Sequence, residues 1–306
     1  MTRSSEKTYS HQSYAAFRPI YLDSLYNAIL SYHKRKIESG AAQSLCVDLG
    51  SGHGVVARAM SKHFVKVIGI DPSEGMIALA KSLTKEEGLS NVTFWQGTSE
   101  QLYFVGNGTV DLVLAGQAAH WFDYSRLWPE LQRKVKPGGS LGFWGLKNTV
   151  FVDYPKAVEI LKDYIYSDDK DKLGSYWPAS GVPMITSMYR NIEPPEQDWE
   201  DIERVDYIPG TSGCNSGEGT LFVGKRARIG DCKETARTWS GFYHWHEAHP
   251  EARKRSAGGS GDVIDACFDE IANVEPEWKN DDFEVEVEWE SFLLLARRRL
   301  AEGNGD

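Results

Sequence analysis

The sequence has little cysteine, a deficit of positive charge and no long hydrophobic run. Its 306 residues include 4 cysteines, and no two of them are spaced closely enough to predict a zinc site or a redox pair. Lysine and arginine number 34 against 44 aspartates and glutamates, and the resulting net charge of -10 disfavours general binding to nucleic-acid phosphates. The sequence also lacks the apolar segments of a membrane span or a signal peptide. We therefore expect a cytoplasmic monomer or weak homodimer that acts on a small molecule, with no nucleic-acid and no membrane partner.

Short apolar runs alternate with helical patterns in the first half of the chain, which predicts strand–helix–strand units and a mostly parallel sheet. The second half is less regular and contains polar, glycine-rich stretches that predict loops. Expected strands cover residues 44–49, 66–70, 91–96, 110–115, 140–146, 202–208 and 283–297, the last forming one or two strands. Expected helices cover 55–64, 74–87, 125–135, 154–166, 233–243 and 262–272. A turn at 136–139 is expected between the third of these helices and its following strand.

The strongest motif is a glycine loop, Val47-Asp48-Leu49-Gly50-Ser51-Gly52-His53-Gly54, which links an apolar strand to a helix. Glycine is needed where the backbone takes positive φ angles and comes close to a ligand. The dinucleotide fingerprint has its third glycine one residue later and places a pyrophosphate on the helix. This spacing disfavours a dinucleotide oxidoreductase, while a purely structural turn remains the alternative.

A second acid, Asp71, ends the next expected strand, about twenty residues after Gly50. A carboxylate at this position can accept hydrogen bonds from both hydroxyls of a ribose. The alternative is that Asp71 or Ser73 caps the helix that follows.

With these motifs the chain resembles the class I S-adenosylmethionine-dependent methyltransferases and, more narrowly, the trans-aconitate methyltransferase-like proteins. The resemblance covers residues 9–147 well and implies S-adenosyl-L-methionine as cofactor, with S-adenosyl-L-homocysteine as product. It implies an α/β, Rossmann-like sheet of seven mostly parallel strands, with helices on both faces and a partly helical C-terminal insertion or cap. The implied parts of this single domain, 1–306, are a helical cover at 1–40, a cofactor core at 41–150, a substrate cap at 151–275 and C-terminal sheet strands at 276–306.

The resemblance and the motifs together predict the cofactor site. Arg18 can form a bidentate pair with the cofactor carboxylate, unless it is a surface or capping arginine. Many related enzymes have aspartate where this chain has Thr98, so backbone amides of Ser99 and Glu100 are expected to contact the adenine instead. The expected cofactor-binding residues are Tyr14, Arg18, Asp48, Gly50, Ser51, Gly52, Gly54, Asp71, Pro72, Met76, Thr98, Ser99, Glu100, Gln117, Ala118 and His120.

His120 and Trp121 follow an expected strand of the sheet, at the edge where ligands bind in open α/β folds. We expect both to position the reactants, although His120 could instead shape the loop by hydrogen bonding. No metal is expected, because the three histidines within 244–249 do not have the spacing of a zinc motif.

The substrate that accepts the methyl group is predicted less directly than the cofactor. A carboxylate is already ionised near neutral pH and needs no general base, and no base constellation is evident in the sequence. The resemblance implies a small di- or tricarboxylic acid, and an aromatic acid fits the many tryptophans. The alternatives are O-, N- or C-methylation of a phenol, amine or quinone, or a non-catalytic nucleoside-binding regulator. The expected substrate-binding residues, several of which could instead be core aromatics, are Tyr21, Trp121, Trp177, Tyr189, Arg237, Trp239 and Tyr243.

Overall fold

The computed structural model describes residues 17, 19, 21–36, 43–178 and 182–300. A nine-stranded sheet runs through this part of the chain in the order β3-β2-β1-β4-β5-β9-β6-β7, and β8 also pairs with β9. The neighbouring strands β3, β2, β1, β4 and β5 pair in parallel. The strand β9 pairs antiparallel with β5, β6 and β8. Their bounds are β1 Leu45–Leu49, β2 Lys66–Asp71, β3 Val92–Gln96, β4 Val110–Gly116, β5 Val135–Phe151, β6 Trp199–Ile208, β7 Glu218–Gly219, β8 Gly224–Arg228 and β9 Glu284–Arg298.

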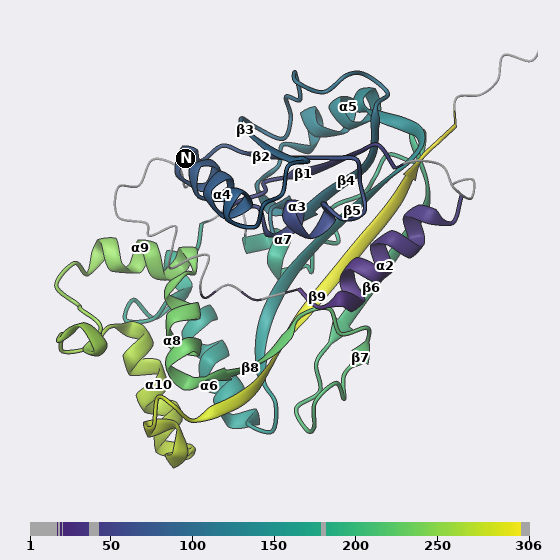
Figure 1. Ribbon diagram of the computed structural model, residues 1–306. Coiled ribbons are helices and arrows are strands. Elements are labelled where there is room, and N and C mark those ends of the chain that lie inside the picture. Colours follow the sequence, from purple (N-terminus) through teal and green to yellow (C-terminus); the bar gives the residue numbers. More distant parts are fainter. Residues whose placement is uncertain (1–16, 18, 20, 37–42, 179–181, 301–306) are drawn as a thin grey trace, which may run out of the picture.

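Helices cover both faces of the parallel strands (Figure 1). Successive side chains of a strand point to opposite faces, so Cys46 joins the apolar cluster of α2, α3 and α4, whereas Val47 and Leu49 join the cluster of α5. The expected α/β fold is therefore confirmed. These helices are α2 Asp23–Lys34, α3 Val55–Met60, α4 Glu74–Glu86 and α5 Tyr124–Lys134.

A helical cap packs on the far ends of the long strands β5 and β9, in the lower left of Figure 1. Phe151 from β5 lies in one apolar cluster with Leu161, Phe268 and Trp278 of the cap. The cap helices are α6 Pro155–Tyr166, α8 Ile229–Arg237, α9 Ser240–Ala248 and α10 Val263–Val274, and the short α7, Val182–Thr186, lies nearer the sheet. Among the described helices, none combines the length and apolarity that a membrane crossing requires.

The expectation of seven strands is wrong, because the sheet of the described residues has nine. The additional strands β7 and β8 are short and polar; β8 has the sequence GKRAR. Neither shows the apolar alternation by which a strand is recognised in a sequence. They form because β6 and β9 offer them backbone partners.

Two local expectations also differ from the structure. The single helix expected at 233–243 is divided into α8 and α9, with Trp239 in extended conformation between them. The hydroxyl of Thr238 donates to the carbonyl of Thr235 at 2.6 Å, a side-chain bond that competes with helix continuation. The turn expected at 136–139 instead lies within β5, at an irregularity in its pairing with β4.

Candidate active site

The glycine loop connects β1 to α3 and takes the backbone conformation that its composition predicts. Gly50 and Gly52 have φ angles of 62° and 53°, in the left-handed region that only glycine adopts at little cost. A Cβ at Gly50 would collide with the side chain of Ala118, whereas a Cβ at Gly52 would meet nothing within 4 Å. Gly50 thus allows the loops after β1 and β4 to approach each other, and Gly52 borders open space that a ligand can fill.

Asp71 lies at the end of β2 and bridges the glycine loop to the start of α4. Its Oδ2 accepts a hydrogen bond of 2.9 Å from the amide of Gly52, and its Oδ1 accepts one of 2.9 Å from the amide of Ser73. Ser73 in turn caps α4, because its hydroxyl accepts from the amide of Met76 at 3.3 Å. A carboxylate oxygen can accept more than one hydrogen bond, so this position is compatible with ribose hydroxyls as additional donors.

Asp48 is buried below the same loop, with 1% of its surface exposed. Its Oδ2 accepts from the amide of Ala57 in the first turn of α3, at 3.1 Å. Burial raises the pKa of this carboxyl to about 8; the nearby charge of Asp71 adds to the rise and the Ala57 hydrogen bond opposes it. In this structure Asp48 therefore holds the helix that follows the glycine loop.

The remaining expected cofactor residues lie around this loop in different ways. The hydroxyl of Ser51 faces β2, since a Cβ added at Gly69 would come within 2.8 Å of it. Glu100 accepts from the amide of Asp123 at 3.0 Å and so helps to hold the start of α5. Met76 and Ser99 are buried, Pro72 and Thr98 are exposed, Gly54 precedes α3, and Tyr14 and Arg18 lie outside the described residues.

The loop after β4 brings Gln117, Ala118 and His120 to the same edge of the sheet. Gln117 has a φ angle of 54°, and its backbone amide donates to the backbone carbonyl of Trp144 at 2.9 Å. The side-chain Nε2 of Gln117 donates to the hydroxyl of Tyr21 at 3.2 Å. Non-glycine residues with positive φ are uncommon and often occur at functional sites. The loop therefore fixes Tyr21 and His120 close to the glycine motif.

A cavity of about 300 Å³ lies between this edge of the sheet and the cap. Three tryptophans line it: Trp177, Trp239 and Trp289. Its polar lining includes Gln117 and His120 from the β4 loop, together with Tyr189. The structure thus brings Trp177, Tyr189 and Trp239, three of the residues predicted to bind the substrate, together around one cavity.

His120 and Tyr189 contact each other in the wall of this cavity. The Nδ1 atom of His120 lies 3.1 Å from the hydroxyl oxygen of Tyr189, although the two residues are 69 positions apart. Trp121 lies beside them, with its ring centroid 4.7 Å from that of His120, and is 43% exposed. This arrangement is compatible with the expected positioning role of His120.

Lys147, which no sequence motif predicts at the site, is the only lysine or arginine among the described residues that line the cavity. Its Nζ lies 3.4 Å from Glu290, which also accepts from Asn148 at 2.6 Å. The hydroxyl of Tyr166 donates to Asn148 at 2.6 Å, and burial, followed by the charge of Glu290, raises the pKa of Tyr166 to about 12. Lys147 directly follows the apolar run of β5. Nothing in this local sequence indicates that the side chain of Lys147 borders a cavity.

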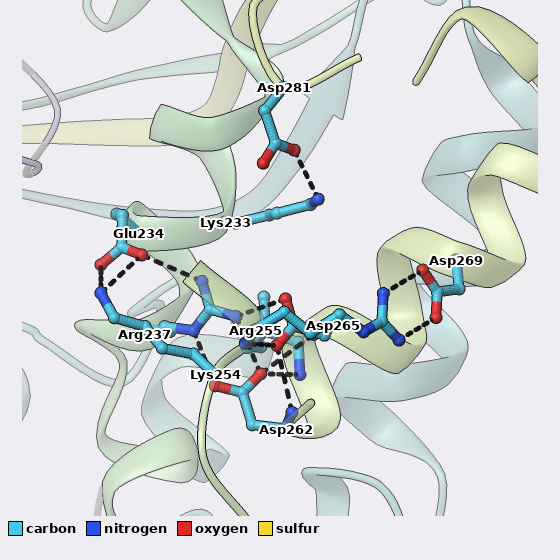
Figure 2. Close-up of polar contacts among 10 residues, drawn as sticks. Lys233, Glu234, Arg237, Lys254, Arg255, Asp262, Asp265, Asp269 and Asp281 are labelled. Carbon is cyan, nitrogen blue, oxygen red and sulfur yellow. Dashed lines mark hydrogen bonds and ion pairs between the residues drawn. The ribbon is translucent and has the colours of Figure 1, made fainter. Parts of the chain in front are cut away.

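Arg237 does not lie where the sequence predicts an anchor for the acceptor. Figure 2 shows its guanidinium within an ion cluster of the cap. Its Nε and Nη2 donate to Asp262 at 2.7 and 2.9 Å, Nη2 also pairs with Asp265 at 2.8 Å, and Nη1 donates to Glu234 at 3.0 Å. These carboxylates come from α8 and from the start of α10, so Arg237 joins the two helices and is not among the residues lining the cavity.

Tyr243 also lies outside the cavity lining, and its hydroxyl donates to Glu247 at 3.0 Å. Within the described ranges, no three histidine, cysteine, aspartate or glutamate side chains are grouped so that they could hold a metal ion. The Nδ1 atoms of His244 and His249 face the carbonyls of Tyr176 and Trp245, at 3.1 and 2.9 Å.

This chain is similar to known methyltransferases. The model of a methyltransferase domain matches residues 47–143, which contain the glycine loop, Asp71 and the β4 loop. A protein of Saccharomyces cerevisiae named "Probable S-adenosylmethionine-dependent methyltransferase CRG1" is 27% identical over 96% of this chain and 97% of its own length. A Dictyostelium discoideum protein named "Putative methyltransferase" is 26% identical over 94% of this chain and 92% of its own length.

One solved structure extends the likeness to the whole fold. It is described as that of a "Putative Type II Methyltransferase" from Anaeromyxobacter dehalogenans, and its TM-score is 0.63. The two sequences are 21% identical over 93% of this chain and 100% of the other. At this identity the similarity is one of fold.

Proposed function

We propose that this S-adenosylmethionine-dependent methyltransferase esterifies the carboxylate of a small acid with an apolar, aromatic or unsaturated body. The observation that carries the proposal is the cavity next to the β4 loop, which is lined by Trp177, Trp239 and Trp289 and by the positively charged Lys147. Aromatic walls favour an apolar body, and an ammonium group favours an anion.

The residues at the ends of β1 and β2 fit S-adenosylmethionine. Gly52 leaves room for a ligand against the backbone, and Asp71 has the position and the acceptor atoms for ribose hydroxyls. The burial of Asp48 makes it a support of α3 in this proposal and leaves contacts with the cofactor to the loop backbone. When bound, the cofactor would supply a methyl group on its sulfonium: an acceptor oxygen in line with the methyl–sulfur bond would bond to the methyl carbon as that bond breaks, and S-adenosylhomocysteine would leave as the thioether.

The task of the protein is then to align the acceptor oxygen and to exclude water. Lys147 would hold the carboxylate, which needs no general base because it is already ionised near neutral pH. Glu290 partly neutralises Lys147, the lining also contains the acidic residue Asp168, and Arg237 is engaged elsewhere. The described lining therefore suits one carboxylate better than the two or three that the trans-aconitate resemblance implies.

The test is a panel of labelled-methyl transfer reactions with aromatic monocarboxylic acids, di- and tricarboxylic acids, phenols and amines. We expect a base-labile methyl ester, formed fastest from an aromatic or unsaturated monocarboxylic acid. Products that are stable to base would contradict the carboxylate assignment, and transfer to tricarboxylic acids alone would contradict the single-anchor argument.

A phenol acceptor is the second candidate, and the His120–Tyr189 contact is the observation that favours it. If His120 donates its Nδ1 proton to Tyr189, Nε2 is the basic nitrogen of the ring, and a base is what a phenol acceptor requires. The panel distinguishes this candidate, because its product is a base-stable ether.

A further inference from the structure

Two neighbouring residues of β5 contact the same carboxylate of β9. The Nζ atom of Lys147 lies 3.4 Å from Oε1 of Glu290, and Nδ2 of Asn148 donates to Oε2 of Glu290 at 2.6 Å. In a regular strand, successive side chains point to opposite faces of the sheet, so two neighbours do not meet one partner in this way. The backbone at these two residues must therefore depart from regular pairing.

The pairing of β5 with β9 contains this departure. Its register shifts between Leu146 and Thr149, so that two residues of β5, Lys147 and Asn148, lie opposite one residue of β9, Glu290. This is the arrangement of a β-bulge, which bends a strand and is common next to active sites because it redirects a side chain. Lys147 lines the cavity, whereas Asn148 is not among the described residues that do.

The two contacts of Glu290 are unequal. The contact with Asn148 is short, whereas that with Lys147 is longer than the roughly 2.7–2.9 Å typical of an ammonium and a carboxylate. Among the described residues, Glu290 is the only acid that forms an ion pair with Lys147, and their side chains are 16% and 21% exposed. Glu290 is thus bonded closely by Asn148 and holds Lys147 only loosely.

Tyr166 fixes the orientation of the Asn148 amide. An ionised carboxylate only accepts hydrogen bonds, so the amide nitrogen of Asn148 must face Glu290 and its oxygen must face away. The hydroxyl of Tyr166 donates to this oxygen at 2.6 Å. A reversed amide would lose both bonds and would bring two acceptors together. The hydrogen bonds therefore run in one direction, from Tyr166 through Asn148 to Glu290.

We propose that Asn148 is a positioning residue that occupies Glu290 and so leaves Lys147 available to the carboxylate of the acceptor. Without this amide, Glu290 would turn toward Lys147 and pair with it closely. An ammonium held in a short, charge-assisted bond binds a second anion less well. The acceptor rests on the proposed function, whereas the competition of Asn148 and Lys147 for Glu290 does not.

The competition can be measured on the full chain without any acceptor. Asn148→Leu removes the amide donor, and pairing with a carboxylate favours the protonated, unreactive form of an amine. The rate at which Lys147 reacts with acetic anhydride, followed by mass spectrometry of its peptide, should therefore fall about threefold or more. The double variant Asn148→Leu, Glu290→Gln should regain the rate of the unmodified protein. An unchanged rate in folded Asn148→Leu would overturn the proposal.

Kinetics with the best carboxylic acid of the panel provide the second measurement. KM should rise about fivefold in Asn148→Leu, while kcat changes less than about twofold. Glu290→Gln alone removes the competitor and should leave KM equal or lower. In the double variant KM should return to within about twofold of the original value, a rescue that general damage to the fold would not produce. A higher KM in Glu290→Gln, or no rescue in the double variant, would overturn the role of Asn148.

Asn91→Leu is the matched control. The side chain of Asn91 also donates two hydrogen bonds, to the carbonyls of Ser61 and Phe64 at 2.8 and 2.9 Å, but it does not line the cavity. This variant should lose stability in urea and keep both KM and the labelling rate of Lys147. A similar rise in KM in Asn91→Leu would contradict a specific role for Asn148.

Two further outcomes are decisive. Asn148→Ala, which only removes atoms, gives the same test if the leucine prevents folding, and an unchanged labelling rate in this variant would again overturn the proposal. If the panel yields only ethers while the labelling of Lys147 responds as expected, the proposed function fails but the hold of Asn148 on Glu290 stands.

Discussion

The amide of Gly52 donates a hydrogen bond of 2.9 Å to the carboxylate of Asp71, and this bond joins the two motifs that the sequence presents 19 residues apart. The contact holds the glycine loop against the end of β2. It also places the acceptor atoms of Asp71 beside the open space above Gly52. Loop conformation and cofactor binding should therefore depend on the same carboxylate.

Replacing Asp71 by alanine should weaken binding of S-adenosylhomocysteine by about 10- to 100-fold, because hydrogen bonds to a charged group contribute about 1.5–3 kcal/mol each. Titration calorimetry measures this effect. Unchanged affinity in Asp71→Ala, or tight binding of NAD by the unmodified protein, would contradict the cofactor site described above.

Gly52→Ala should cost both stability and cofactor affinity. A Cβ in left-handed backbone costs about 1–2 kcal/mol, and here the added methyl would also enter the ligand space. Gly88→Ala is a matched control, since Gly88 has a φ angle of 69° and nothing within 4 Å of an added Cβ. We expect similar losses of unfolding free energy in both variants but weaker S-adenosylhomocysteine binding only in Gly52→Ala. Equal affinities would show that Gly52 does not border the cofactor.

Arg237→Met should destabilise the protein by about 3–5 kcal/mol, because it leaves the buried carboxylates Asp262 and Asp265 without their cation. Arg255, which Figure 2 shows in the same cluster, is the control: its side chain and that of Asp269 are 48% and 53% exposed, so Arg255→Met should cost less than about 1 kcal/mol. Urea unfolding measures both. A large rise in KM for the acceptor in Arg237→Met, without loss of stability, would contradict this role and indicate that Arg237 binds the substrate.

Asp48 should make the cofactor-free protein less stable as pH rises. Its pKa in the folded chain is about 8, against about 4 for an unfolded aspartate, so the folded state holds a proton that the unfolded state has released. The contribution is complete below the unfolded pKa and is lost as pH rises through the folded one. The Asp48→Asn variant has no carboxyl group to ionise at this position. Between pH 5 and 8 the unfolding free energy of the unmodified protein should therefore fall by up to about 1.4 kcal/mol per pH unit relative to that of the variant. Parallel urea-unfolding profiles would contradict the raised pKa.

Lys147→Gln should raise KM for a carboxylic acid acceptor about tenfold or more, since it removes a charge-assisted contact. Lys156→Gln, on the exposed side of α6, is the control and should leave KM unchanged. Steady-state kinetics measure both variants. An unaltered KM in Lys147→Gln would leave the acceptor carboxylate without its proposed anchor.

Local patterns in the sequence predicted the cofactor half of the molecule well. The runs that form β1 to β4 are short and apolar. Gly50 and Gly52 have positive φ angles, which residues with a Cβ adopt only at a cost, and this explains the choice of glycine. The second half of the sheet was predicted less well, because β7 and β8 have no apolar alternation of their own and depend on partners distant in the chain.

The sequence by itself determined the parallel α/β core and the glycine loop between β1 and α3, since both follow from apolar periodicity and from backbone conformations that few residues tolerate. Only the tertiary structure decided that Lys147 and Tyr189 border the cavity while Arg237 is held by Asp262. The reason is physical: a charged or aromatic side chain carries no local sign of its partner, and packing of the cap on β5 and β9 selects which of these groups pair with each other and which remain at a cavity.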